Sequence, residues 1–234
     1  MANPARPTVS TPATLTPVGY LQFETGAFFA QTSPQFSTLA NLNEVTKLTV
    51  HRRLEFIMGL TPVGGATGET NVTAFGGLNV GFQAVLFGGE DPKPTLAIGY
   101  LHQVVNSPVP DTDIGTAQNS GLVLLSFNPL GFHVDTNALF NQQTVNHDSH
   151  TQYGQTLSIS HPIWKLTGAG EIWHFTQPFL KGDAAGLLWA LSYSPRKNLV
   201  FDAGFEHGLT SSSTQWEEFF GFTYLLPHRL WARH

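Results

Sequence analysis

The chain has 234 residues, with 12% charged, 41% hydrophobic and a formal net charge of −5. The usual charged share is about 25%, and the 23 Gly, 15 Pro and 18 Phe present instead argue against a disordered chain and against a long helical protein. The 11 basic and 16 acidic residues offer no basic surface for nucleic acid, and the absence of cysteine excludes disulfides, zinc–thiolate sites and thiol catalysis.

The first 18 residues form a polar, Pro-rich segment, which we call the lead-in. It lacks the apolar core of a signal peptide, so the sequence taken literally is cytoplasmic. A polar start also suits the mature form of an exported chain. For an exported protein we expect the lead-in to be a flexible periplasmic tail or a plug.

From Gly19 onward, apolar and polar residues alternate with a period of two, as where Leu21 and Phe23 alternate with Gln22 and Glu24. This period is typical of β-strands, and no segment has a convincing helical face. About twelve such segments are predicted as strands: 19–30, 39–51, 53–61, 74–87, 94–105, 119–128, 131–143, 151–160, 165–175, 184–194, 198–207 and 214–226. A short tail, 227–234, follows, and the chain is predicted to be all-β.

The links between these segments alternate in length. Short links such as 51–52 and 195–197 follow the even-numbered segments, whereas longer polar links such as 61–73 and 144–150 follow the odd-numbered ones. Outer-membrane barrels have short periplasmic turns and longer external loops. The rhythm therefore predicts a barrel with an even number of strands.

The composition of the two strand faces favours a membrane barrel over a soluble one. The polar face is rich in Gly, Thr, Ser, Asn and Gln, and the apolar face is heavily aromatic. A transmembrane barrel needs an apolar band toward lipid and a polar interior. Strands near ten residues are long enough to cross a bilayer when tilted, and closure is required because unpaired backbone groups cannot face lipid.

Six motifs in chain order resemble the MetA-pathway of phenol degradation family, transporter-like outer-membrane barrels of Gram-negative bacteria. The motifs are LQFETG at 21–26, RLEF at 53–56, GLNVGF at 77–82, PTLA at 94–97, LVFDAGF at 199–205 and FGFTY at 220–224. The resemblance implies an outer-membrane pore that takes up aromatic or other hydrophobic compounds. The chain departs from the pattern at Gln83, where a basic residue is expected, and in continuing past Tyr224.

Twelve side chains on the inward parity are candidates for lining the lumen: Glu24, Lys47, Arg53, Glu55, Gln83, His133, Asp135, Asn137, Glu171, Trp173, Asp202 and Glu206. The charged members could set the selectivity of a pore. They could equally form internal ion pairs that brace a narrow barrel. Trp173 is also a candidate for stacking on a solute, while Trp164, Tyr193 and Tyr224 fall near strand ends and suit an interfacial girdle.

Other chemistry has weaker support. His147, Asp148 and His150 share one loop, but polar loop residues explain them without a metal. No Gly-x-Ser-x-Gly motif is present, and His133 with Asp135 is the only pair that suggests catalysis. We therefore predict no enzyme, catalytic residue, cofactor or metal.

The sequence predicts one antiparallel transmembrane β-barrel of about twelve strands in a bacterial outer membrane, surrounded by lipid. It would act as a passive channel for small, hydrophobic or aromatic molecules, and its oligomeric state stays open. Two alternatives remain: a non-conducting structural or adhesion barrel with a plugged lumen, and a soluble ligand-binding β-barrel.

Overall fold

The computed structural model describes residues 1–68, 71–88, 93–110, 112, 118–145, 147–178 and 180–231. Its regular elements are all β-strands, which confirms the predicted class. They are β1 (Leu21–Gln31), β2 (Thr38–His51), β3 (Leu54–Thr67), β4 (Val72–Ala74), β5 (Gly77–Phe87), β6 (Thr95–Val105), β7 (Asn119–Phe127), β8 (His133–Val145), β9 (Asp148–Ile163), β10 (Leu166–Phe175), β11 (Ala184–Arg196), β12 (Leu199–Gly208) and β13 (Trp216–Leu225). The described residues contain no helix long and apolar enough to cross a membrane.

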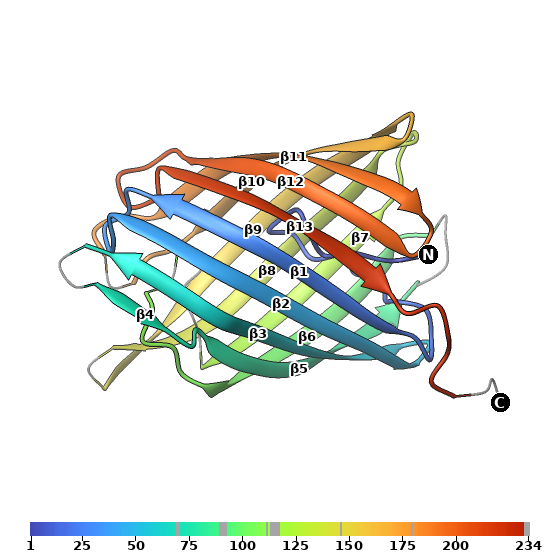
Figure 1. Cartoon of the computed structure of the whole chain (residues 1–234), viewed down its shortest axis with the longest axis horizontal. Coiled ribbons are helices and arrows are strands. Elements are labelled where there is room, and N and C mark those ends of the chain that lie inside the picture. Colours follow the sequence, from blue (N-terminus) through green and yellow to red (C-terminus); the bar gives the residue numbers. More distant parts are fainter. Residues whose placement is uncertain are drawn as a thin grey trace.

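Twelve of the strands form a closed antiparallel barrel (Figure 1). Each barrel strand pairs with its neighbours along the chain, and β13 closes the ring on β1 with Ala27 opposite Phe220. The short strand β4 pairs only with the far end of β3. Because no edge of the barrel is left open, each of the twelve barrel strands has a partner on both sides.

The structure corrects two of the predicted loops. The link predicted at 61–73 is largely strand, because β3 continues to Thr67 in register with β2 and β4 pairs with it. Gly64 is a residue typical of a turn, yet it lies within β3. A Cβ there would lie 2.4 Å from Asn41 Oδ1, so the glycine leaves room for the Asn41 side chain in its present position. The link predicted at 144–150 is also shorter, since β8 ends at Val145 and β9 begins at Asp148.

The two faces of the wall differ sharply in exposure. Outward side chains such as Phe56, Ile172 and Phe220 are about half exposed, at 50%, 49% and 57%. Inward Gln22 and Glu55 are 0% and 2% exposed. The apolar parity therefore lies outside and the polar parity inside, which is the reverse of a soluble barrel.

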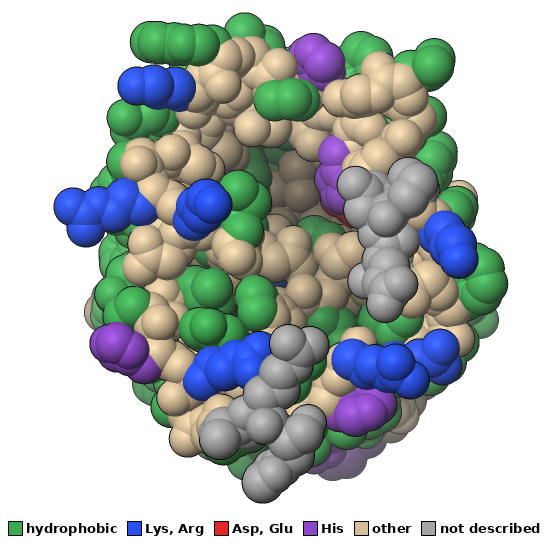
Figure 2. Space-filling model, turned by 90° about the vertical axis from the view of Figure 1, so that its right-hand side faces the viewer, with side chains coloured by type: hydrophobic (Ala, Val, Ile, Leu, Met, Phe, Trp, Pro, Cys, Tyr) green, Lys and Arg blue, Asp and Glu red, His purple; other side chains and the backbone are tan. Residues whose placement is uncertain are grey.

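The two ends of the barrel also differ. At one end lie the tight turns after β2, β7, β9 and β11, together with the start of β1 and the end of β13; we call this the short-turn end. The links after β1, β6, β10 and β12 form the long-loop end. Both chain termini lie at the short-turn end, at the right of Figure 1. Viewed from this end, the barrel has a central hollow with Lys and Arg side chains around its rim (Figure 2).

Candidate functional site

The lead-in lies inside the barrel and carries no strand. Near its start, the Ala2 N–H donates to the carbonyl of Lys197 at 2.8 Å, and just after its end the Gly19 N–H donates to the carbonyl of Thr49 at 2.8 Å. Ser10, between these points, is fully buried. The segment therefore enters and leaves at the short-turn end and arches through the lumen; its dark blue trace is visible within the barrel in Figure 1.

The first part of the arch is bound by β1. Gln22 binds both polar groups of the Asn3 backbone, accepting from its N–H and donating to its carbonyl, each at 2.8 Å. Glu24 accepts from the N–H groups of Ala5 and Arg6 at 3.1 and 3.3 Å. Lys47 on β2 forms an ion pair with the same carboxylate. A buried charge is stable only when it is paired and hydrogen-bonded, and Glu24 meets both conditions.

Arg6 is the cation of the lead-in and has a shaped site in the wall. Its guanidinium Nη2 lies 3.1 Å from Asp202 Oδ1, and its Cζ lies 5.8 Å from the centre of the Phe219 ring. Gly26 and Gly221 are opposite each other on β1 and β13 and leave room for the group. A Cβ on Gly26 would lie only 2.4 Å from the Arg6 Cζ.

Glu171 on β10 holds the middle of the arch. Its carboxylate accepts from the N–H groups of Val9 and Ser10, both at 2.7 Å. The Ser10 hydroxyl lies 2.5 Å from the same carboxylate and 2.7 Å from the Thr156 hydroxyl on β9. Hydrogen bonds to an ionised acceptor are about twice as strong as neutral ones. The three bonds to Glu171 therefore hold the middle of the lead-in firmly.

The rest of the arch is bound in the same way. The Asn137 amide accepts from the Thr11 N–H at 2.6 Å and donates to its carbonyl at 3.0 Å. Three further wall side chains bind the segment from Pro12 to Thr16, namely Gln83 on β5, Ser126 on β7 and Glu55 on β3. Backbone groups outside a strand ladder need such partners when they are buried. Six strands supply them: β1, β3, β5, β7, β8 and β10. Bonds to the side chains of Thr16, Ser10 and Arg6 add β2, β9 and β12, so that nine strands contact the lead-in.

Cavities lie on both sides of the arch. One of about 350 Å³ opens toward the short-turn end, where Met1 and Lys197 line it. A central one of about 160 Å³ and a third of about 410 Å³ lie toward the long loops. Arg6 lines all three cavities, and Pro7 and Thr8 line the first two. Residues 6–8 therefore form a partition between the cavity at the short-turn end and the central cavity.

The remaining candidate residues have varied positions. Arg53 is exposed in the turn before β3, and His133 lies at the rim, with its Nε2 3.0 Å from Asp135 Oδ2. Trp173 is buried, with its ring centre 5.6 Å from that of Phe175. Glu206 lines the central cavity.

Sequence reasoning missed several residues that bind the lead-in or line the cavities: Arg6, Gln22, Ser126, Thr156 and Glu217. One signal was available. Seven of the buried described side chains are acidic and one, Lys47, is basic, so most inward carboxylates must take hydrogen bonds from groups outside the strands.

Metal binding receives no geometric support. In the part of the chain that the structure describes, no group of three or more His, Asp or Glu side chains could hold a metal ion. His150 pairs with Asp148 at 3.0 Å on the surface, and His161 contacts the carbonyl of Gly131 at 3.1 Å. In the described part of the chain, His147, Asp148 and His150 therefore form no metal site, either by themselves or with His161.

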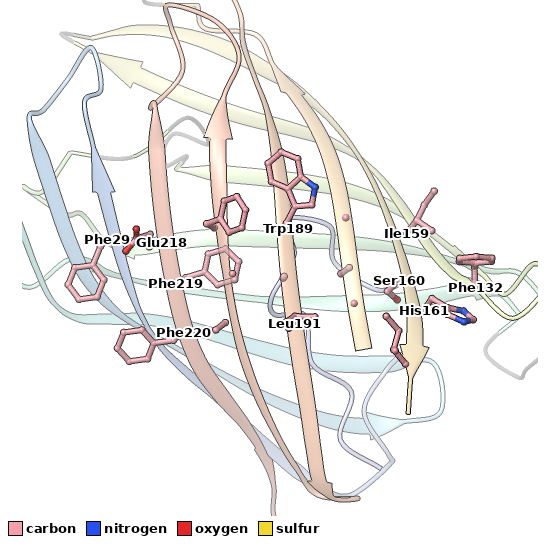
Figure 3. Close-up of a pocket in the computed structure, with 18 residues that line it drawn as sticks. Phe29, Phe132, Ile159, Ser160, His161, Trp189, Leu191, Glu218, Phe219 and Phe220 are labelled. Carbon is pink, nitrogen blue, oxygen red and sulfur yellow. The ribbon is translucent and has the colours of Figure 1, made fainter. Parts of the chain in front are cut away.

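A larger hollow, of about 1140 Å³, lies on the outer face of the wall (Figure 3). It crosses β9 to β13 where Gly168 and Gly170 carry no side chain, and Phe220, Trp189 and Ile159 project around it. It is separate from the lumen and belongs to the apolar outer band.

The comparisons with known proteins define the fold. No family model and no curated protein sequence matches the chain. Among solved structures, the KdgM porin aligns with a TM-score of 0.55 at 14% identity, covering 87% of this chain and 98% of the porin. The β domain of the Bordetella autotransporter BrkA aligns with a TM-score of 0.50 at 15% identity, covering 89% of this chain and 99% of that domain. The P. putida toluene transporter TodX gives 0.48 at 9% identity, with 95% and 93% covered. The chain has the fold of a porin-like outer-membrane β-barrel.

Proposed function

We propose that the protein is a channel of the bacterial outer membrane for passive passage of small molecules. The observation that carries this proposal is a closed barrel whose lumen holds cavities on both sides of the lead-in. Outer-membrane barrels have their short turns on the periplasmic side, so we place the short-turn end of this barrel toward the periplasm. The twelve candidate residues would then either line the path of a solute or stabilise the barrel wall around that path.

The outer face supports placement in a membrane. Its exposed aromatic and aliphatic side chains form a band around the barrel, and Trp164 at the β9–β10 turn is 89% exposed with Lys165 Nζ 5.2 Å from its ring centre. Such a contiguous apolar surface would cause a soluble protein to aggregate. In a bilayer it contacts acyl chains, and the outer hollow is filled by lipid.

Small aromatic or other hydrophobic molecules are the proposed solutes. The MetA-pathway resemblance implies them, and the central cavity has apolar walls formed by Phe28, Leu188 and Phe219. Its volume, about 160 Å³, is close to the roughly 150 Å³ of an apolar cavity that binds benzene. Glu206 and Glu217 add a polar side, so the cavity suits a small ring with a hydroxyl group.

A non-conducting barrel is the second candidate, and the lead-in favours it. Residues 2–17 fill part of the lumen through contacts on nine strands, as a permanent internal brace would. The two candidates differ in one measurable property, which is ion current.

We expect the folded protein in planar bilayers to give discrete current steps, and phenol to interrupt the open current more than glucose at equal concentration. Folding is checked beforehand by the difference in gel mobility between unheated and boiled samples. A folded barrel without current would support the brace, and a monodisperse protein in buffer without detergent would contradict the membrane assignment.

A further inference from the structure

We propose that the lead-in is a displaceable gate: the lumen binds residues 2–17 as a peptide ligand, and their release toward the short-turn end opens a cation-preferring pore. This inference rests on the proposed channel function and names what closes the channel. It assigns the inward polar residues a shared role as a peptide-binding site.

The contacts have the character of ligand recognition. The segment has four prolines, at positions 4, 7, 12 and 17, and proline cannot donate to a sheet. Apart from the Ala2 N–H, the described groups of residues 2–16 are held mainly by side chains. Proline fixes its own φ, so a proline-rich peptide has less conformational entropy to lose on binding than one without prolines. Every polar contact can be replaced by water when the segment leaves.

The path of the arch permits release without unfolding the barrel. Its first residue, Met1, is 76% exposed at the short-turn end. Its other end is at the same rim, where Gly19 adopts a φ of +84° and turns the chain into β1. A glycine takes this conformation without strain. The segment can therefore swing out on Gly19 as a tether, with no need to pass through the lumen.

Arg6 is the latch of the gate. It lines the cavities on both sides of the partition, and its charge is neutralised by Asp202. The guanidinium lies over Gly26 and Gly221, where a Cβ would be 2.4 Å from Arg6 Cζ and 2.9 Å from Arg6 Nε respectively. Displacing this one side chain would loosen the wall between the two halves of the lumen.

The open state follows from what the lead-in leaves behind. Its release removes the charge of Arg6 and the N–H and O–H donors from Glu24, Glu55, Glu171 and Asp202. Glu24 keeps its ion pair with Lys47 and Glu55 its bond from Thr49, but the bonds given above for Glu171 and Asp202 all come from the lead-in, and carboxylates that lose such partners are too costly to leave dry. Water and cations must therefore fill the space, so the opened lumen favours cations over anions.

A disulfide that locks the lead-in to the wall tests the gate directly. The chain has no cysteine, and the Ser10 and Thr156 hydroxyls are 2.7 Å apart. In the variant Ser10→Cys/Thr156→Cys, we expect oxidation to abolish current steps and a reductant to restore them. The control is Thr38→Cys/Thr67→Cys, whose hydroxyls are 2.6 Å apart on β2 and β3 and do not touch the lead-in. Equal currents from the oxidised lock and the oxidised control would overturn the gate while the channel stands.

A single methyl group provides the opposite test. Gly26→Ala puts a Cβ against the Arg6 guanidinium, and the three nearest atoms it meets all belong to Arg6. We expect the open probability to rise about tenfold, the factor that corresponds to about 1.4 kcal/mol. Gly170→Ala is the matched control, because its Cβ meets nothing within 4 Å. An unchanged open probability in Gly26→Ala would contradict the latch.

Removing the ligand completes the test. A chain lacking residues 2–17 should conduct continuously and prefer K⁺ over Cl⁻ in reversal-potential measurements. A synthetic peptide of residues 2–17 should block it from one side of the bilayer, and a scrambled peptide should not. Anion preference, or equal block by both peptides, would overturn the proposal. Silence of the folded deletion chain and of every other variant would overturn the channel and the gate together.

Discussion

The two faces of the barrel wall use the same alternation to meet two different environments. On the outer face, side chains such as Phe220 and Phe29 contact one another across strands, with ring centres 6.2 Å apart, and the described residues leave both of them exposed. On the inner face, side chains such as Glu171 are buried by a segment of the same chain. The outer face thus needs only apolar side chains, whereas on the inner face each polar group needs a particular hydrogen-bond partner. Tolerance to substitution should differ accordingly.

A charge placed on the outer face should have the largest effect. Leu191 lies near the middle of β11 and is 53% exposed. Leu191→Arg should lower the free energy of unfolding by about 2–4 kcal/mol in lipid vesicles, because the charge must enter the bilayer. Urea titration followed by tryptophan fluorescence measures it, with Leu191→Met as the apolar control. Equal stability of the two variants would contradict a lipid-facing position.

Removal of one inner charge should have a smaller effect that depends on the lead-in. Glu171→Gln weakens three contacts from Val9 and Ser10, and should cost about 1–3 kcal/mol in the same titration. In a chain lacking residues 2–17 the same substitution should cost nothing or stabilise, since the donors are gone. A loss of equal size in both backgrounds would show that Glu171 acts on the wall alone.

The pairing of outer aromatic rings should have the smallest effect. A double-mutant cycle of Phe29→Leu and Phe220→Leu should give a coupling free energy of about 0.5–1.5 kcal/mol, the range for stacked rings. Trp189 and Phe205, whose ring centres are 5.2 Å apart, offer a second pair for comparison. Zero coupling in both pairs would mean that lipid contacts the rings as well as they contact each other.

Much of the fold could be predicted from sequence because a period of two states which residues share a face. The ends of the strands were harder to predict where glycine residues suggested a turn. Gly64 and Gly65 resemble a turn, yet they lie in β3, where they pair with β2 and β4. A Cβ on Gly64 would meet Asn41 Oδ1 at 2.4 Å and one on Gly65 would meet Thr73 Oγ1 at 3.3 Å. The local sequence does not distinguish a glycine in a turn from a glycine that leaves space for a side chain of a neighbouring strand.

The candidate site could be predicted only in part. Alternation placed Glu24, Glu171 and Asp202 on one face of the wall, but not their partners, which lie up to 196 residues away in the chain. The lead-in was considered as a tail or a plug because its polar, proline-rich composition excludes a strand without indicating where it rests. The surplus of inward acids was the one clue that donors had to come from elsewhere.

The spread of the lead-in's partners also dictates an order of assembly. The first residues of the chain are held by groups from Gln22 on β1 to Asp202 on β12, so the complete binding site does not exist until those strands are arranged around one axis. Contacts between residues so distant in sequence form late in folding. The lead-in precedes the strands in the chain but should thus dock after them, and a fluorophore at Met1 would report the moment at which the ring of strands is complete.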